Sequence, residues 1–107
     1  MKYILNSAVI TTPGLYSYHL ITIDEMINWL QQGNWISTIG YPETANVLEK
    51  LSGFPISVNR IQIRMEKRDE ALVFRLTQRI QDVREKGKLG LDFVQKYLEI
   101  GILEKLE

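Results

Sequence analysis

The sequence predicts an α+β domain in which a mixed sheet of about five strands is flanked by helices. Short runs rich in β-branched and aromatic residues indicate strands, apolar residues at helical spacing indicate helices, and Gly or Pro turn signals separate them. The expected order of elements is β-β-α-α-β-β-α-β. The chain has 107 residues, of which 45% are apolar and 24% are charged, so a single globular domain over residues 1–107 is expected.

Two strands are expected first. Tyr3–Ile10 is rich in β-branched and aliphatic residues and ends at a Pro-Gly turn signal. Leu15–Ile21 alternates loosely and carries aromatic residues that suit a pleated surface. The histidine in this second run, His19, is expected to be a partly buried strand residue rather than a catalytic base.

Two helices are expected next. Thr22 and Glu25 have the spacing of a capping box, in which each side chain satisfies a free backbone N–H at a helix start. This predicts a helix over residues 23–32. A second helix is expected to begin near Pro42 and to end at Gly53.

The second half of the chain carries the clearest strand pattern. Arg60–Met65 alternates strictly between polar and apolar residues, and Ala71–Arg79 is expected to return as its antiparallel hairpin partner. Residues 91–98 outline a third helix that Gly101 closes. Residues 102–106 are expected to form a last strand at the sheet edge.

The loop Ser37–Thr44 is the expected ligand cradle. Gly40 permits backbone conformations that other residues avoid, and Pro42 suits a first helical turn. The free N–H groups and partial positive charge of a helix start suit an anion such as a phosphate. The alternative is a plain helix start that binds nothing.

Composition excludes several kinds of site. The chain has no cysteine and one histidine, which excludes disulfides, thiol nucleophiles and sulfur-based zinc sites, and argues against a histidine-rich metal site. No run approaches the length of a transmembrane helix, and the first residues become polar too quickly for a secretory signal. We therefore expect no membrane partner and a cytoplasmic location.

The charge balance favours a small anionic ligand. The formal net charge is zero, with −2 in residues 1–55 and +2 in residues 56–107. This excess is too small to indicate a long nucleic acid, but it fits a small anion held by two or three arginines. Arg60, Gln62 and Arg64 share one face of the predicted strand, and a solvated sheet face also explains them.

Four segments of the chain, taken together, have the order and separations of a known family. The segments are Tyr3–Ala8, Ser37–Gly40 with Thr44 and Ala45, Val58–Ile63, and Thr77–Ile80. With them the chain resembles the type III anti-CRISPR ring nucleases of archaeal viruses, phages and bacterial mobile elements. That family degrades the second messenger cyclic tetra-adenylate. The resemblance covers nearly the whole chain, although none of the four motifs is specific by itself.

The resemblance implies a homodimer that holds a two-fold-symmetric cyclic ligand across the subunit interface. It also implies cleavage without a metal or any other cofactor. A ribose 2′-hydroxyl attacks the adjacent phosphorus, the 5′-oxygen leaves, and a 2′,3′-cyclic phosphate remains. By position, Arg60 and Arg79 match the family's phosphate-contacting arginines. Asn6 and Gln78 match polar residues that line the ligand, and Gly40 belongs to the cradle loop.

Two positions depart from the family pattern. Tyr41 stands where the family has its catalytic histidine, directly after the glycine of the Ile-Gly motif. Histidine has an ordinary pKa of about 6.5 and donates a proton at neutral pH, whereas tyrosine, at about 10, is a weaker acid. Cleavage is therefore expected to be slower, without loss of binding. The family's lid glutamate corresponds to Asp82 without gaps or to Glu85 with a short insertion, and both alternatives stay open.

Three functions follow from these observations. The first is an enzyme that linearises cyclic tetra-adenylate with Tyr41 as proton donor, or with alignment and arginine electrostatics carrying most of the rate. The second is a binding protein that sequesters a cyclic oligonucleotide without cutting it. The third is a protein-interaction module that uses an open face of the sheet.

Overall fold

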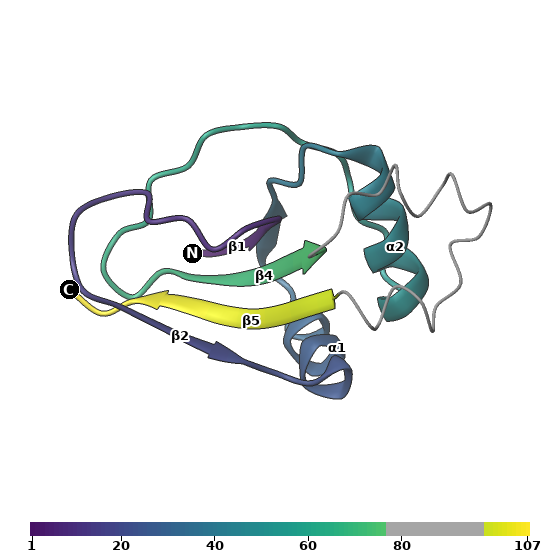
Figure 1. Ribbon diagram of the computed structural model, residues 1–107, viewed down its shortest axis with the longest axis horizontal. Coiled ribbons are helices and arrows are strands. Elements are labelled where there is room, and N and C mark those ends of the chain that lie inside the picture. Colours follow the sequence, from purple (N-terminus) through teal and green to yellow (C-terminus); the bar gives the residue numbers. More distant parts are fainter. Residues whose placement is uncertain (77–97) are drawn as a thin grey trace.

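The computed structural model describes residues 1–76 and 98–107, in which five strands form a mixed sheet and two helices pack on it (Figure 1). The elements are β1 (Lys2–Leu5), β2 (Tyr16–Leu20), α1 (Ile23–Gln31), β3 (Trp35–Ser37), α2 (Pro42–Ser52), β4 (Glu70–Leu76) and β5 (Leu98–Lys105). Across the sheet the strands run in the order β2-β5-β4-β1-β3. The predicted α+β class and mixed sheet are therefore confirmed.

Strand β1 lies inside the sheet and is parallel to both of its neighbours. Its residue Tyr3 is paired with Ile36 of β3 on one side and with Ala71 of β4 on the other. Strand β5 is antiparallel to β4 and to β2. Because β1, β3 and β4 point the same way, their carboxyl ends meet at one edge of the sheet.

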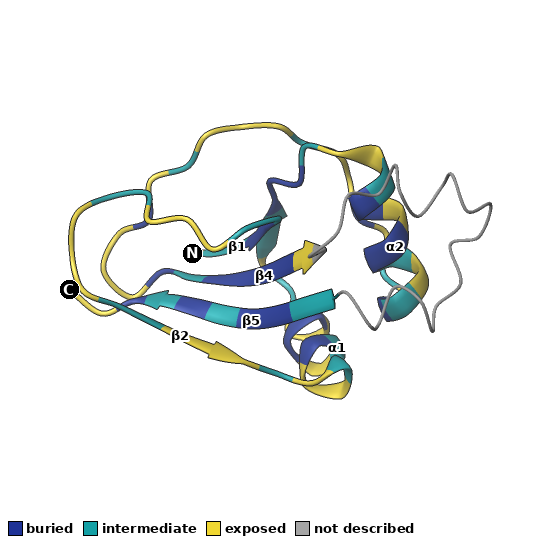
Figure 2. Ribbon diagram, in the orientation of Figure 1, coloured by how far each residue is buried: buried dark blue, intermediate teal, exposed yellow. Residues whose placement is uncertain are grey.

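Both helices pack on the same face of the sheet. Helix α1 begins at the predicted capping box, in which Thr22 and Glu25 each accept a hydrogen bond from the other's backbone N–H. Helix α2 ends at Gly53, whose φ of 78° is the left-handed conformation that favours glycine. Neither helix is long and apolar enough to cross a membrane. The core between helices and sheet (Figure 2) includes Ile4, Met26, Leu30, Ala45, Leu48, Leu72, Phe74 and Ile100.

On the opposite face of the sheet, the segment that precedes β4 packs the side chains of Ile63 and Met65. Met65 is 1% exposed and belongs to a second apolar cluster with Leu5, Val73 and other residues of the sheet. Its backbone N–H donates to the hydroxyl of Thr11 at 2.9 Å, and its carbonyl accepts from the hydroxyl of Thr12 at 2.7 Å. These bonds fix the segment that follows β1 against the segment that precedes β4.

The predicted strand Arg60–Met65 and its hairpin with Ala71–Arg79 are wrong. The segment is extended but belongs to no strand, and β4 pairs with β1 and β5 instead. The alternation is only partly realised, because Ile63 packs against the second cluster whereas Ile61 is 47% exposed. Alternation predicts an extended segment with one apolar face, but it does not identify which groups accept its backbone hydrogen bonds.

Other predicted boundaries in the first half of the chain also differ from the structure. The first strand ends at Leu5 rather than Ile10, because Asn6 and Ser7 turn the chain out of the sheet. Strand β3 has three residues, too few for a periodic pattern to predict it. His19 is exposed on the edge strand β2, so the prediction that it is partly buried is wrong.

The last strand is longer and more central than predicted. Strand β5 begins at Leu98 and lies between β2 and β4, so it is not an edge strand. Gly101, which was expected to close a helix, is paired with Val73 in the sheet. The Tyr18 ring covers it, 2.6 Å from where a Cβ would lie. The rest of the predicted third helix, residues 91–97, lies outside the described residues.

Candidate ligand-binding site

A hollow of about 450 Å³ lies at the edge of the sheet where β1 and β3 end. Asn6 is the first residue after β1, and Thr38 is the first after β3. The parallel arrangement of these strands brings both polar side chains to the same place. The start of α2 and the segment beginning at Arg60 complete the wall, and the full lining is Asn6, Thr38, Gly40, Tyr41, Arg60, Ile61 and Gln62.

Hydrogen bonds fix the loop that follows β3. The side chain and the backbone N–H of Thr38 both donate to the carbonyl of Ile4, at 2.8 and 2.9 Å. The hydroxyl of Ser37 donates to the carbonyl of Ser57 at 2.7 Å. Ser37 and Thr38 are both buried, so these bonds satisfy polar groups that water does not reach and hold the loop backbone in place.

Asn59 joins the two segments that carry the site. Its backbone N–H donates to the carbonyl of Ile39 at 2.9 Å, and its side-chain Nδ2 donates to the carbonyl of Ser37, also at 2.9 Å. These bonds fix the residue before Arg60 against the residue before Gly40. Asn59 therefore positions Arg60 beside the loop.

The space beside Gly40 is restricted, whereas its backbone conformation does not require glycine. A Cβ at this position would lie 3.0 Å from Cγ and 3.2 Å from Cδ of Arg60. The glycines with positive φ are Gly14, Gly33 and Gly53, so the expectation that Gly40 adopts an unusual backbone conformation is wrong. The missing side chain instead lets the aliphatic stem of Arg60 lie directly against the loop.

Tyr41 occupies the N-cap of α2, immediately before the first helical residue, Pro42. This confirms the predicted helix start. No side-chain hydrogen bond from Tyr41 caps the helix, and the residue is 52% exposed. The Arg60 guanidinium lies 6.0 Å from the centroid of the Tyr41 ring, within the range of a cation–π contact. Tyr41 and Arg60 therefore present an aromatic ring and a cation together at the hollow.

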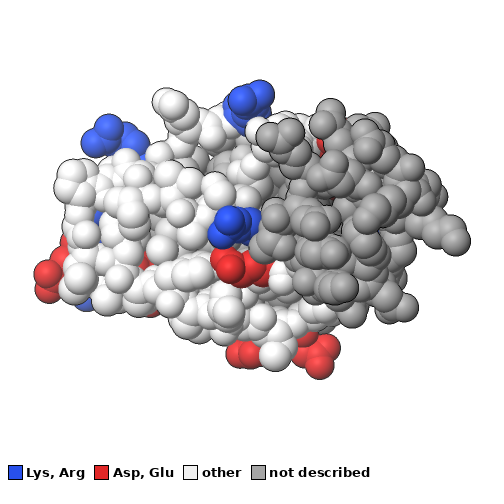
Figure 3. Space-filling view, in the orientation of Figure 1, with Lys and Arg blue, Asp and Glu red and all other residues white. Residues whose placement is uncertain are grey.

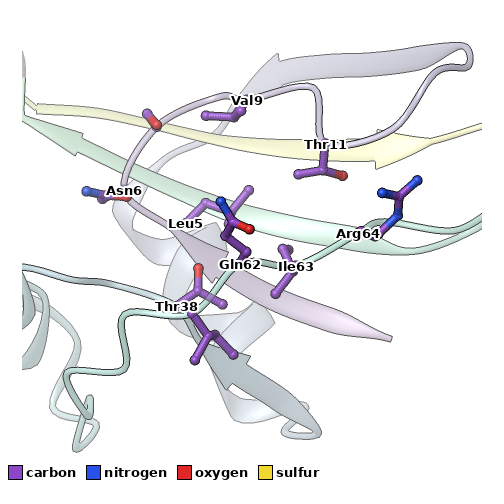
Figure 4. A pocket seen from close by; sticks show the side chains of 10 residues that line it. Leu5, Asn6, Val9, Thr11, Thr38, Gln62, Ile63 and Arg64 are labelled. Carbon is purple, nitrogen blue, oxygen red and sulfur yellow. The ribbon is translucent and has the colours of Figure 1, made fainter.

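A second hollow of about 400 Å³ adjoins the first and shares four lining residues with it, Asn6, Thr38, Ile61 and Gln62. Figure 4 shows this second hollow, with Val9 and Thr11 on a loop that passes over Gln62 and Arg64. Its remaining lining residues are Leu5, Ser7 and Ile63. The two hollows together form a groove with one arginine in each part.

The described lining of this groove carries positive charge without negative charge. Arg60 and Arg64 are exposed, and no aspartate or glutamate lines either hollow among the described residues. The ion pairs found in residues 1–76 and 98–107 involve neither arginine. On the face seen in Figure 3, the basic side chains stand apart from one another, and the central one adjoins an acidic side chain. This arrangement favours a small anion over an extended polyanion.

The structure brings together the predicted site residues that it describes. Asn6, Gly40, Tyr41 and Arg60 all line the first hollow. The other predicted site residues lie outside the described residues, namely Gln78, Arg79, Asp82 and Glu85. In residues 1–76 and 98–107 no group of three or more His, Asp or Glu side chains gathers to hold a metal ion.

Three residues of the site are not among those predicted individually to bind the ligand, although Thr38 lies in the predicted cradle loop and Gln62 on the polar face with Arg60. Thr38 has a signal that could find it, since it is polar and directly follows a strand, as Asn6 does. Gln62 belongs to the polar face of the alternating segment, but only the fold places that face at the hollow. Asn59 has no local signal, because its function depends on a contact between segments that are far apart in the sequence.

Comparisons with known proteins agree with this fold. A family model described as STIV B116-like matches residues 2–92. The YddF protein of Bacillus subtilis (strain 168) is 43% identical over 77 residues, which are 70% of this chain and 71% of YddF. Protein 26 of the Sulfolobus islandicus filamentous virus is 35% identical over 105 residues, covering 94% of this chain and 85% of the viral protein. The structure of B116 from Sulfolobus turreted icosahedral virus has a TM-score of 0.78 at 22% identity and covers 95% of this chain and 97% of B116. At that identity, the likeness to B116 is one of fold.

Proposed function

Because this chain belongs to the STIV B116-like family, we propose that it is a ring nuclease that binds cyclic tetra-adenylate, cleaves it without a metal and so ends type III CRISPR signalling. The main support is the meeting of Asn6, Gly40, Tyr41 and Arg60 around one hollow with no carboxylate among its described lining residues. Residues that match the family's ligand-site positions only by resemblance thus lie together in space. A ligand rich in phosphate suits their charge.

The proposed reaction needs little from the protein beyond alignment, charge stabilisation and one proton. The 2′-oxygen forms a bond to phosphorus while the bond from phosphorus to the 5′-oxygen breaks. Arg60 stabilises the charge on the nonbridging oxygens, and the hydroxyl of Tyr41 gives a proton to the leaving 5′-oxygen. The proton of the 2′-hydroxyl passes to water or to a carboxylate, for which Asp82 and Glu85 are the two alternatives. The proposed ligand is symmetric, and the proposed homodimer presents this site twice.

A second candidate function is sequestration of the cyclic nucleotide without cleavage. The observation in its favour is the exposed Tyr41 ring beside the Arg60 guanidinium. An aromatic face next to a cation is a platform on which a nucleobase stacks while the arginine holds a phosphate. Binding then needs no proton transfer from Tyr41.

Turnover of labelled cyclic tetra-adenylate separates the two functions. With purified protein in EDTA, we expect linear products that end in a 2′,3′-cyclic phosphate. Tyr41→Phe is expected to lose at least about 90% of the rate while it keeps the affinity, since it removes the hydroxyl and retains the ring. Tight binding without any product would favour sequestration. If the protein bound no cyclic oligoadenylate, neither function would stand.

Asn59 is expected to act as a positioning residue. Asn59→Ala removes the hydrogen bond to the Ser37 carbonyl, which should lower the free energy of unfolding by about 1 kcal/mol. It should also weaken ligand binding, because Arg60 is then held less firmly beside Gly40. Urea unfolding and titration calorimetry measure the two effects. Asn28→Ala, an exposed change on α1, is the matched control: it should leave the affinity unchanged and should not lower the free energy of unfolding, because alanine favours a helix. Unchanged affinity in Asn59→Ala would contradict the positioning role.

A further inference from the structure

The second hollow contains an arginine to which the proposed mechanism gives no function. We propose that Arg64 binds a second phosphate of the same ligand and that this hollow is a separate nucleotide subsite beside the one at Arg60. The inference rests on the proposed function and extends it. It specifies that the groove recognises two neighbouring nucleotide units together.

The shape of the groove supports two linked subsites. Residues from three separate parts of the chain line both hollows, so the two spaces share a wall. Arg60 lines only the first hollow, and Arg64 lines only the second. The two arginines are four residues apart, and even a fully extended chain of that length spans at most about 14 Å. One small oligonucleotide can therefore reach both arginines.

The backbone on both sides of Arg64 is fixed. Ile63 packs against the second apolar cluster. Met65 is buried, and its backbone is bonded to the hydroxyls of Thr11 and Thr12. The guanidinium is thus carried on a rigid base, so binding a phosphate orders only the side chain of Arg64.

The charge of Arg64 is not neutralised within the described residues. The residue is exposed, and no ion pair in residues 1–76 and 98–107 includes it. In Figure 4 its guanidinium lies at the end of the hollow that is farther from Asn6. An exposed arginine on a rigid base, with no carboxylate nearby in the described lining, is suited to a phosphate.

The rest of the second hollow suits a nucleobase. Val9 and Ile61 line it and are 49% and 47% exposed. They offer an apolar wall to the flat face of a base. The amide of Gln62, which Figure 4 shows extending toward the loop of Val9, supplies a hydrogen-bonding group at the edge. The base and the phosphate of one nucleotide thus each find a matching group.

Two linear dinucleotides test this inference directly. ApA contains one phosphate, and 5′-phosphorylated pApA contains two. We expect the native protein to bind pApA about tenfold more tightly than ApA, the effect of one additional charged hydrogen-bonded contact. Arg64→Ala and Arg60→Ala should each abolish this gain, since the described lining of the groove then keeps only one arginine. Lys67→Ala, which removes one exposed positive charge outside both hollows, should preserve it.

The outcomes separate the subsite from the function on which it rests. If the native protein binds cyclic tetra-adenylate but Arg64→Ala keeps the gain in affinity for pApA as Lys67→Ala does, the proposal of a second subsite is wrong and the proposed function stands. An equal affinity of the native protein for ApA and pApA also overturns the subsite alone. If neither the cyclic ligand nor either dinucleotide binds, both proposals fail. Thermal melting checks the fold of each variant. Arg64→Lys should restore part of the gain in affinity for pApA because it restores the positive charge.

Discussion

Arg60→Ala is expected to weaken the binding of cyclic tetra-adenylate by about ten- to a hundredfold, because each hydrogen bond to a charged group contributes about 1.5–3 kcal/mol. Loss of one phosphate contact should also lower the slope of log affinity against log salt concentration by about 0.7. Calorimetric titrations between 50 and 300 mM salt, roughly the range over which such slopes are measured, provide both values. The melting temperature should hardly change, since Arg60 is exposed and has no ion pair in the described residues.

Two controls define what this result means. Arg60→Lys keeps the charge but loses the planar fork, so it should retain the salt dependence and recover only part of the affinity. Lys67→Ala should leave both properties unchanged. A large fall in the melting temperature of Arg60→Ala would show that Arg60 supports the fold instead of binding the ligand. Unaltered affinity would remove it from the site.

Tyr41→His is expected to raise the rate of ring cleavage at neutral pH by about a hundredfold, the lower part of the range for general acid catalysis. Histidine is the residue that the resemblance implies at this position, and its ordinary pKa of about 6.5 is closer to neutrality than the value of about 10 for tyrosine. The N-cap backbone of Tyr41, with φ of −117° and ψ of 121°, is extended and accepts either side chain. Single-turnover rates of the native protein and the variant measure the difference.

The dependence on pH provides the control for this gain. In Tyr41→His the rate should fall as the pH rises above about 6.5, because the imidazolium that donates the proton is lost. In the native protein no such fall is expected in that range. A variant whose cleavage is no faster than that of the native protein, at unchanged affinity, would show that proton donation at this position does not limit the reaction.

Local signals in the sequence predict the helices well and the sheet poorly. The capping box of Thr22 and Glu25 and the pair of Pro42 and Gly53 are complete within a few residues, and the structure confirms both helices. Strand pairing depends on partners far away in the chain. The segment Arg60–Met65 has the alternation of a strand, yet the backbone of Met65 bonds to the hydroxyls of Thr11 and Thr12 instead of to another strand. Its pattern predicts its shape but not its partners.

The candidate site, like the fold, is predicted only in part by local sequence signals. The loop after β3 has a composition that predicts a cradle, and resemblance adds Asn6 and Arg60 at distant positions. Only the parallel pairing of β1 with β3, and the bonds of Asn59, bring these residues to one hollow. The importance of Asn59 and the spatial requirement at Gly40 arise from contacts between segments, and a single sequence carries no trace of such contacts.

The packing of Gly40 against Arg60 links two positions that are distant in the chain. A Cβ at position 40 would meet three carbons of the arginine stem at 3.0 to 3.3 Å, so a larger residue there requires the stem to move by a few tenths of an ångström. The two positions are therefore expected to covary among family members, with glycine retained wherever a long side chain occupies the other position. A shorter side chain at position 60 meets no such crowding beside Gly40, so in the evolution of a new ligand preference at this groove we expect the change at position 60 to precede a larger residue at position 40.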